Sequence, residues 1–403
     1  MGVTSKVWLT VFLTFSTQHA FAQQVATERA DAAARFKNTE LGKLVFAEIF
    51  VPEPPTVFSA DGGRHLSHEL FITNASGSTW GISRIQVVAG DQVLLDASGD
   101  ALRNSLTPWP QTRETAGGDV SQLPAGARVL YYAWVDLPKA GPAPATITHR
   151  VTFRPADGGS ELTIETEPVV VKTGLVVTAA PFRGTNWVAA SGPSNSSRHR
   201  RAVLPLNGVP RVPQRFAIDW LQIDSAGNTF KGDPATNESY YAFGKEVHAI
   251  LGGTVTEVKD GIADNTPGQW PGGSITLETV AGNHVLIDVG QHRWVMYAHL
   301  KRGSVRVKLG ERIAAGHVLG LLGNSGNTPE PHLHLQMMDR NSPLGGQGLP
   351  FAMQEFTLLG KALIAFGGSK VPGAPRADWL ARPEMRRGET PLENMIVKFP
   401  DRT

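Results

Sequence analysis

The chain has 403 residues, 38 Lys and Arg against 36 Asp and Glu, and no cysteine. Its net charge of +2 and the lack of aromatic–basic interleaving argue against a nucleic-acid-binding protein. The absence of cysteine excludes disulfides and thiolate metal ligands. This length allows two or three domains, and 43 glycines, 28 prolines and little 3.6-residue periodicity predict a mainly β protein with many short strands.

The first residues have the pattern of a secretory signal peptide. Lys6 precedes an apolar run over residues 7–15, and Ala20-Phe21-Ala22 offers a cleavage site, so residues 1–22 are predicted to be removed on export. A buried N-terminal helix is the alternative. The run is too short for a transmembrane helix, and no later segment approaches 18 apolar residues. Export without disulfides is compatible with a secreted or periplasmic protein of the bacterial cell envelope.

Residues 23–173 are predicted to form an accessory domain. From residue 44 onward, short alternating apolar runs, such as those at 69–73 and 129–135, are separated by turn clusters such as Asp157-Gly158-Gly159. About seven such strands predict an immunoglobulin-like β-sandwich, which could bind a protein partner. A linker is expected over 174–198, and a tail that wraps the surface or is mobile over 367–403.

The most informative motif is His332-Leu333-His334. A Gly/Asn-rich turn at 323–327 precedes it and an apolar alternation follows it, so the segment is predicted to be the start of a strand. Because strand side chains alternate with period 2, both imidazoles point to one face. Such a pair can offer one nitrogen to a metal ion and another to acid–base work, as a hydrolytic zinc site requires. Two polar residues on a solvated strand face are the alternative interpretation.

Several further segments accompany this motif, in a fixed order. They are Gln214 to Asp219, Phe243 to Ala249, Gly253 to Val255, Gly282 to Val285, Tyr297-Ala298-His299-Leu300, Gly316 to Asn327, and Pro331 to His334. Together they resemble the LytM/lysostaphin-type zinc endopeptidase domain, which cuts peptide cross-links of bacterial cell walls. The resemblance covers residues 199–352 and implies an antiparallel β-sheet peptidase domain, placed at 199–366. It also implies that Asp219 and His334 bind Zn²⁺ and that His299 and His332 are the catalytic histidines that do not bind it.

One ligand position departs from the family pattern. The family's first ligand is a His four residues before the Asp, and this chain has Arg215 there, whose guanidinium has no lone pair to give a cation. Either the domain does not bind metal, or another residue takes that place. His199 is the candidate; the alternative is a surface residue in the basic run 198–201.

A hairpin argument favours His199. Apolar runs at 200–206 and 214–221 flank the turn signal Asn207-Gly208-Val209-Pro210. A turn centred on residue 209 would place His199 directly opposite Asp219, with both side chains on one face. A one-residue slip in register would put His199 on the wrong face.

Together with the export signal, the resemblance implies a zinc-dependent endopeptidase that hydrolyses peptidoglycan stems or cross-links. The predicted metal ligands are His199, Asp219 and His334, and the predicted catalytic residues are His299 and His332. A LytM-like domain without metal, which binds cell wall or activates another hydrolase, is the main alternative. A purely structural β protein is the third.

Overall fold

The computed structural model describes residues 47–110, 118–272, 275–363 and 376–401. The signal-peptide prediction for residues 1–22 lies outside them. The mainly β prediction is confirmed, since the helical elements in these ranges are only α2 (Gly99–Ser105), α3 (Arg198–Arg201) and the 3₁₀ turn η3 (Asn237–Ser239). None of the helices in the described ranges is long and apolar enough to cross a membrane.

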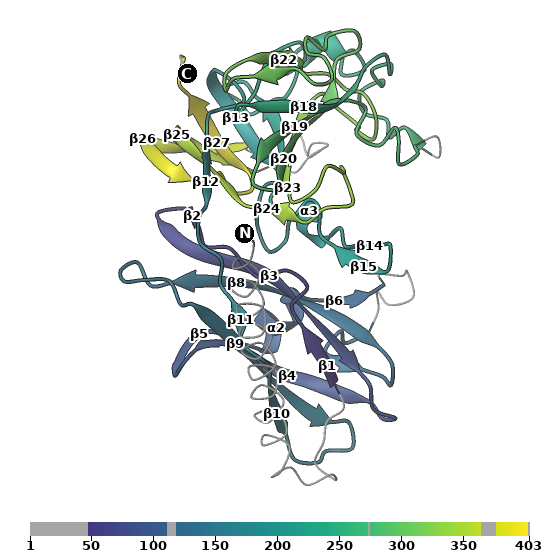
Figure 1. Cartoon of the computed structure of the whole chain (residues 1–403), viewed down its shortest axis with the longest axis vertical. Coiled ribbons are helices and arrows are strands. Elements are labelled where there is room, and N and C mark those ends of the chain that lie inside the picture. The colour runs from purple at the N-terminus through teal and green to yellow at the C-terminus, as the bar shows by residue number, and fades with distance from the viewer. Residues whose placement is uncertain (1–46, 111–117, 273–274, 364–375, 402–403) are drawn as a thin grey trace, which may run out of the picture.

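Two antiparallel sheets form the N-terminal part and share one hydrophobic core (Figure 1). Strand β9 illustrates why: alternate residues are more exposed, and the buried set that faces the other sheet is Ile147, Val151 and Phe153 together with one polar residue, His149. The immunoglobulin-like assignment of this sandwich stays a prediction. The first sheet contains β1 (Ala47–Phe50), β2 (Phe58–Ala60), β3 (Gly63–Asn74), β8 (Arg128–Leu137) and β6 (Leu106–Trp109). The second contains β10 (Leu162–Glu165), β9 (Thr146–Pro155), β4 (Trp80–Ala89), β5 (Gln92–Ser98), β7 (Gln122–Leu123) and β11 (Val169–Val170).

A larger sheet forms the C-terminal part. Its core is built from residues such as Ile218, Trp220, Tyr297 and Leu335, all fully buried. The main path runs β12 (Val176–Thr178), β25 (Phe351–Ala362), β27 (Met395–Phe399), β13 (Gly184–Ala190), β16 (Ile218–Gln222), β23 (Leu333–Met338), β20 (Arg293–Leu300), β19 (Asn283–Gly290), β18 (Gly253–Lys259) and β21 (Arg312–Ile313). Strands β24 (Gly348–Leu349) and β26 (Ala377–Glu389) pair beside this path, and two small sheets join β14 (Leu204–Leu206) to β15 (Val209–Arg211) and β17 (Glu246–His248) to β22 (Val318–Leu321).

Two segments differ from their expected character. The expected linker at 174–198 contributes β12 and β13, and β13 pairs with both β16 and β27. The expected tail at 367–403 contributes β26 and β27 within its described residues. The division into domains at 173/174 and 366/367 stays a prediction, and these strands favour assigning both segments to the larger sheet.

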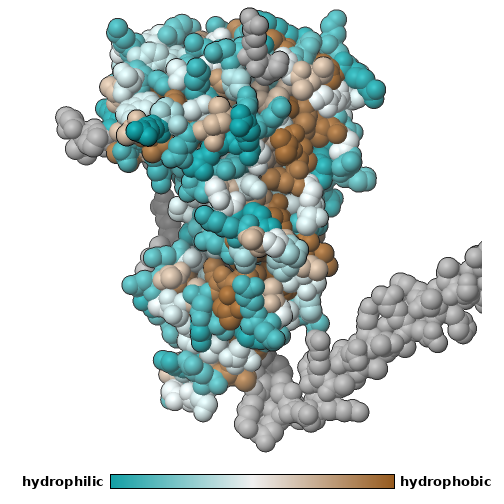
Figure 2. Space-filling view, turned by 90° about the vertical axis from the view of Figure 1, so that its left-hand side faces the viewer, coloured by the Kyte–Doolittle hydropathy of each residue, from teal (hydrophilic) through white to brown (hydrophobic). Residues whose placement is uncertain are grey.

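The two parts adjoin directly, as Figure 2 shows on one side of the molecule. Phe58 of β2 packs edge-on against Phe216, with ring centroids 5.3 Å apart, and the Thr390 amide donates to the Ser59 carbonyl. A deeper contact joins Glu69 of β3 to Arg200 and Arg215. The sandwich therefore contacts α3 (Arg198–Arg201) and the segment that leads into β16.

Candidate metal centre

Asp219 and His334 lie opposite each other on neighbouring strands. Strands β16 and β23 pair antiparallel with Asp219 in register with His334, so their side chains leave the sheet on the same face. Asp219 Oδ1 lies 2.9 Å from His334 Nδ1, and both side chains are more than nine-tenths buried. The alternation that brings Asp219 to this face sends Ile218 and Trp220 into the core.

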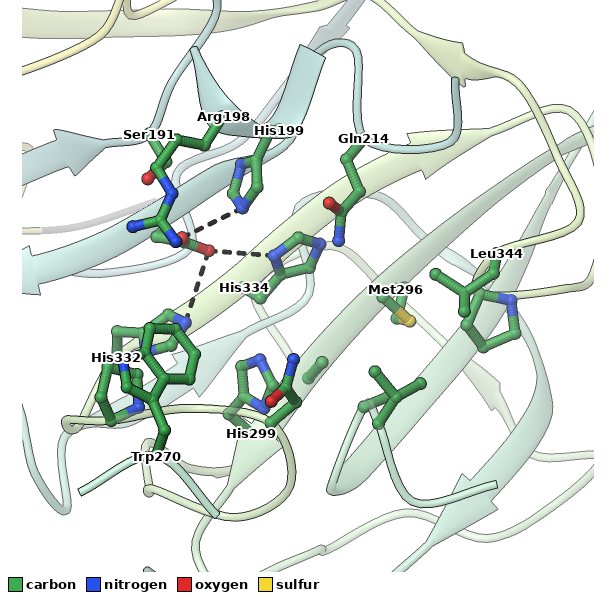
Figure 3. Close-up of a pocket in the computed structure, with 17 residues that line it drawn as sticks. Ser191, Arg198, His199, Gln214, Trp270, Met296, His299, His332, His334 and Leu344 are labelled. Carbon is green, nitrogen blue, oxygen red and sulfur yellow. Dashed lines mark hydrogen bonds and ion pairs between the residues drawn. The ribbon is translucent and has the colours of Figure 1, made fainter. Parts of the chain in front are cut away.

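His199 reaches the same carboxylate from above the sheet (Figure 3). Its Nε2 lies 3.1 Å from Asp219 Oδ2, and its ring centroid lies 4.9 Å from that of His334. The donor atoms of His199, Asp219 and His334 all lie within 4.8 Å of one another. The structure thus brings together the three residues that the sequence selects as metal ligands.

The hairpin argument for His199 was wrong, although the residue lies beside Asp219. The hairpin pairs Leu204 with Arg211 and Leu206 with Val209, so its centre lies between residues 207 and 208 and it spans only three pairs. His199 belongs to α3, and β16 pairs with β13 and β23 instead. Because Pro205 and Pro210 each lack a backbone N–H, the ladder between β14 and β15 stays short, and the chain before it turns into a helix.

The tautomers of the two histidines fit a metal ion. Gln336 donates its amide N–H to the Pro343 carbonyl, which leaves its Oε1 to accept from His334 Nε2 at 2.8 Å. His199 Nδ1 donates to the Ala217 carbonyl at 3.4 Å. In its neutral form each ring then presents an unprotonated nitrogen to the Asp219 carboxylate. Electron-pair donors this close need a cation between them, either a proton or a metal ion, and such outer hydrogen bonds are usual around metal-binding histidines.

His332 and His299 lie beside these three residues. His332 Nδ1 donates to the Glu330 carbonyl at 2.9 Å, and its Nε2 lies 3.4 Å from Asp219 Oδ1. His299 Nδ1 donates to the Ser325 carbonyl at 2.7 Å, and its ring centroid lies 4.7 Å from that of His332. His299 has a backbone φ of +64°, an uncommon value for a residue other than glycine, of the kind that recurs at functional sites.

Burial and mutual charge shift the pKa values of this cluster. Burial by itself raises the pKa of Asp219, but His199 and His332 outweigh it and hold that pKa well below its usual range. Burial tends to lower the pKa of His199, yet Asp219 raises it overall. Burial, together with the neighbouring His332 and His334, lowers the pKa of His299 well below 6.5. Asp219 is therefore a carboxylate and His299 a neutral imidazole near pH 7.

A groove runs past these side chains, with apolar and cationic walls. Met296 and Leu344 line one side of it. Arg198 and Trp270 line another, with the Arg198 guanidinium 6.0 Å from the indole centroid. Sequence reasoning missed these lining residues and also Gln336. The signal for Gln336 was available, because it lies two residues beyond His334 on the same strand face.

Residues 239–345 match the model of peptidase family M23. Over this segment the chain resembles an M23 peptidase domain. This match includes His299, His332 and His334 but not His199 or Asp219, so the first two candidate ligands lie upstream of the matched segment.

Curated proteins are similar to part of the chain. The chain is 34% identical over 140 residues to the peptidoglycan DD-endopeptidase ShyA of Vibrio cholerae, which is 34% of this chain and 30% of that protein. It is 31% identical over 100 residues to endolysin 2638A of Staphylococcus phage 2638A, or 24% of this chain and 17% of that protein. The chain therefore spans less than a third of the length of these relatives.

Solved M23-type structures also match. The catalytic domain of lysostaphin from Staphylococcus simulans is 20% identical, with 41% of this chain and 88% of that domain covered and a TM-score of 0.23. A TM-score this low is no evidence of a shared overall structure.

Proposed function

We propose that this protein is a zinc-dependent endopeptidase that hydrolyses peptide bonds of peptidoglycan stems or cross-links. The observation that carries the proposal is the convergence of His199, Asp219 and His334 within 4.8 Å, beside two further histidines in the segment that resembles an M23 peptidase domain. The similarity to a peptidoglycan DD-endopeptidase supports wall peptides as the substrate class. A peptidoglycan substrate in turn supports a site of action in the periplasm or at the cell surface.

Two imidazole nitrogens and one carboxylate oxygen suit Zn²⁺, which takes three protein ligands and an open fourth position in catalytic sites. His334 would bind through Nδ1 and His199 through Nε2, since their other nitrogens are engaged by Gln336 and Ala217. When bound, Zn²⁺ lowers the pKa of a coordinated water to about 7 and polarises a carbonyl group. The buried carboxylate of Asp219 adds the negative charge that balances the cation.

His299 and His332 would serve proton transfer and oxyanion stabilisation. Donation from His299 Nδ1 to Ser325 fixes the ring and leaves Nε2 as a proton acceptor. Donation from His332 Nδ1 to Glu330 fixes the second ring in the same way. Both line the groove and are held without large side-chain freedom, as general acid–base catalysis requires.

The alternative function, a metal-free regulator of another hydrolase, draws support from Arg215 at the family's first ligand position. This support is weaker because Arg215 pairs with Glu69 at 2.6 Å, while His199 Nε2 lies 3.1 Å from Asp219 Oδ2 and is available as the first ligand.

The test is digestion of purified sacculi with the zinc-loaded mature chain, followed by analysis of the released muropeptides. The proposal expects zinc-dependent conversion of cross-linked dimers to monomers. A chain that contains zinc but leaves dimers intact would refute the cross-link substrate, and a chain that binds no zinc would favour the regulator.

A further inference from the structure

A buried ion cluster joins the sandwich to the segments that carry two of the candidate ligands. Glu69 of β3 accepts from Arg200 Nε at 3.1 Å and from Arg215 Nη2 at 2.6 Å. The three residues are 1%, 0% and 3% exposed. Charges buried this deeply persist only when they are paired and fully hydrogen-bonded, so the cluster tolerates little displacement.

The remaining donors of Arg200 end on the sandwich. Its Nη2 donates to the carbonyls of His68 at 2.9 Å and Ala133 at 2.8 Å, in β3 and β8. Its Nη1 donates to Asn195, whose own amide donates to the Tyr132 carbonyl at 3.0 Å. The guanidinium is therefore fixed by two strands of the sandwich rather than by the peptidase sheet.

Arg200 directly follows His199 on α3. This helix has only four residues, and its N-cap residue Ser197 makes no side-chain capping hydrogen bond. A helix this short has no stability of its own and takes its position from outside contacts. Arg201 adds two such contacts, to Thr107 at 3.2 Å and to the Asn104 carbonyl at 2.8 Å, again in the sandwich part of the chain.

Arg215 extends the same connection to the second ligand. It lies four residues before Asp219, and its Nη1 donates to the Gly348 carbonyl at 3.1 Å. Glu69 thus touches one arginine beside His199 and another at the entry to β16. In this chain the position that the family gives to a metal ligand is occupied by an anchor to a different domain.

We propose that the sandwich is a structural part of the metal centre, and that Glu69 is the positioning residue that sets His199 against Asp219 and His334. This inference rests on the proposed zinc site but not on the identity of the substrate. It assigns the accessory domain a function that needs no separate partner: without Glu69, α3 loses its fixed position and the third ligand is no longer held in place.

The experiment compares Zn²⁺ affinity in the full-length mature chain and its Glu69→Gln variant, by competition with a chromogenic chelator. We expect a 10–100-fold weaker affinity, the usual loss when a residue that orients a metal ligand is changed. Glu48→Gln is the matched control, because Glu48 also pairs with an arginine of the sandwich, Arg128 at 2.9 Å, but is 58% exposed and does not belong to the buried Glu69 cluster. The control should bind Zn²⁺ like the wild type.

A second measurement separates positioning from general destabilisation. In a His199→Ala background, Glu69→Gln should cause a much smaller further loss of affinity, because the ligand that it positions is already gone. If Glu69→Gln does not fold, Asn195→Ala carries the test, since it removes one Arg200 contact and leaves the buried charges paired. We expect a smaller loss of affinity in the same direction.

The outcomes distinguish the two proposals. A wild-type chain that binds no Zn²⁺ overturns both the metal site and the positioning role. Wild-type binding with unchanged affinity in the folded Glu69→Gln or Asn195→Ala chain overturns the positioning role alone. Equal losses from Glu69→Gln in the wild-type and His199→Ala backgrounds would also overturn it.

Discussion

Mild acid should destabilise the sandwich through a buried pair of histidines. His68 Nε2 and His149 Nε2 lie 2.7 Å apart, and the residues are 1% and 0% exposed. Burial lowers the pKa of His149 to about 4. Burial, with His149, Arg200 and Arg215 nearby, also lowers the pKa of His68 well below 6.5. Both rings are neutral in the folded protein at pH 7, where one N–H donates to the other nitrogen.

The sign of the effect follows from the direction of these shifts. An unfolded His149 takes up a proton as the pH falls through about 6.5, whereas the folded one resists until about pH 4. The contribution of His149 to the free energy of unfolding is therefore fully present above pH 6.5 and is lost as the pH falls from about 6.5 to about 4. Each pH unit within this window is worth about 1.4 kcal/mol, so His149 alone removes roughly 2 kcal/mol between pH 7.5 and pH 5.

The assay is urea unfolding at pH 7.5 and pH 5.0 in chelator-containing buffer, for the wild type and His149→Gln. The variant should be less stable at pH 7.5, but its free energy of unfolding should fall by about 2 kcal/mol less on acidification. His317→Gln, at an exposed position in the peptidase part, is the control and should fall like the wild type. If the free energy of unfolding falls equally in the wild type and in His149→Gln between pH 7.5 and pH 5.0, the assignment of this acid sensitivity to His149 is refuted.

Three further predictions concern the candidate site. His199→Ala should lower bound zinc from about one ion per chain to a small fraction in elemental analysis, because two ligands remain; full zinc content would remove His199 from the site. His332→Ala should keep zinc but lose about 10²–10⁴-fold in turnover of wall peptides, and zinc loss would mark it as a ligand instead. Gly282→Ala should lower thermal stability, because φ is +62° there and a Cβ would lie 2.2 Å from the Ser325 carbonyl oxygen that holds His299. This strain should cost about 1–3 kcal/mol, and an unchanged melting temperature would contradict it.

Short sequence patterns correctly predicted the features that depend on neighbouring residues, such as strands and turns. Strand alternation around His334 predicted an apolar face and a face that carries the histidines. In the structure both faces of β23 are buried: Leu333 and Leu335 pack in the core, and His334 lies opposite Asp219. The mainly β class followed from turn residues and short apolar runs. The choice of His199 arose from the missing ligand at Arg215, and the structure places it beside Asp219 by a route that the turn signal did not reveal.

What the sequence did not reveal depends on pairings between distant segments. Nothing near residues 176–190 or 395–399 indicates that these strands join the peptidase sheet, because each is short and its partners lie far along the chain. The Glu69 cluster has the same character: a lone acidic residue in an alternating strand is ordinarily a solvated one. Glu69 is buried and ion-paired in the structure because Arg200 and Arg215, which lie far along the chain, approach its carboxylate.

The position of β27 has a consequence for how the protein folds. This strand lies between β13 and β25, and it pairs Trp187 with Val397. The sheet that carries Asp219 cannot be completed until residues 395–399 reach it, and pairing over so long a stretch of chain makes folding slow. Because β13 pairs with both β27 and β16, the strand that carries Asp219 obtains its full set of neighbouring strands only after the C-terminal residues are in place.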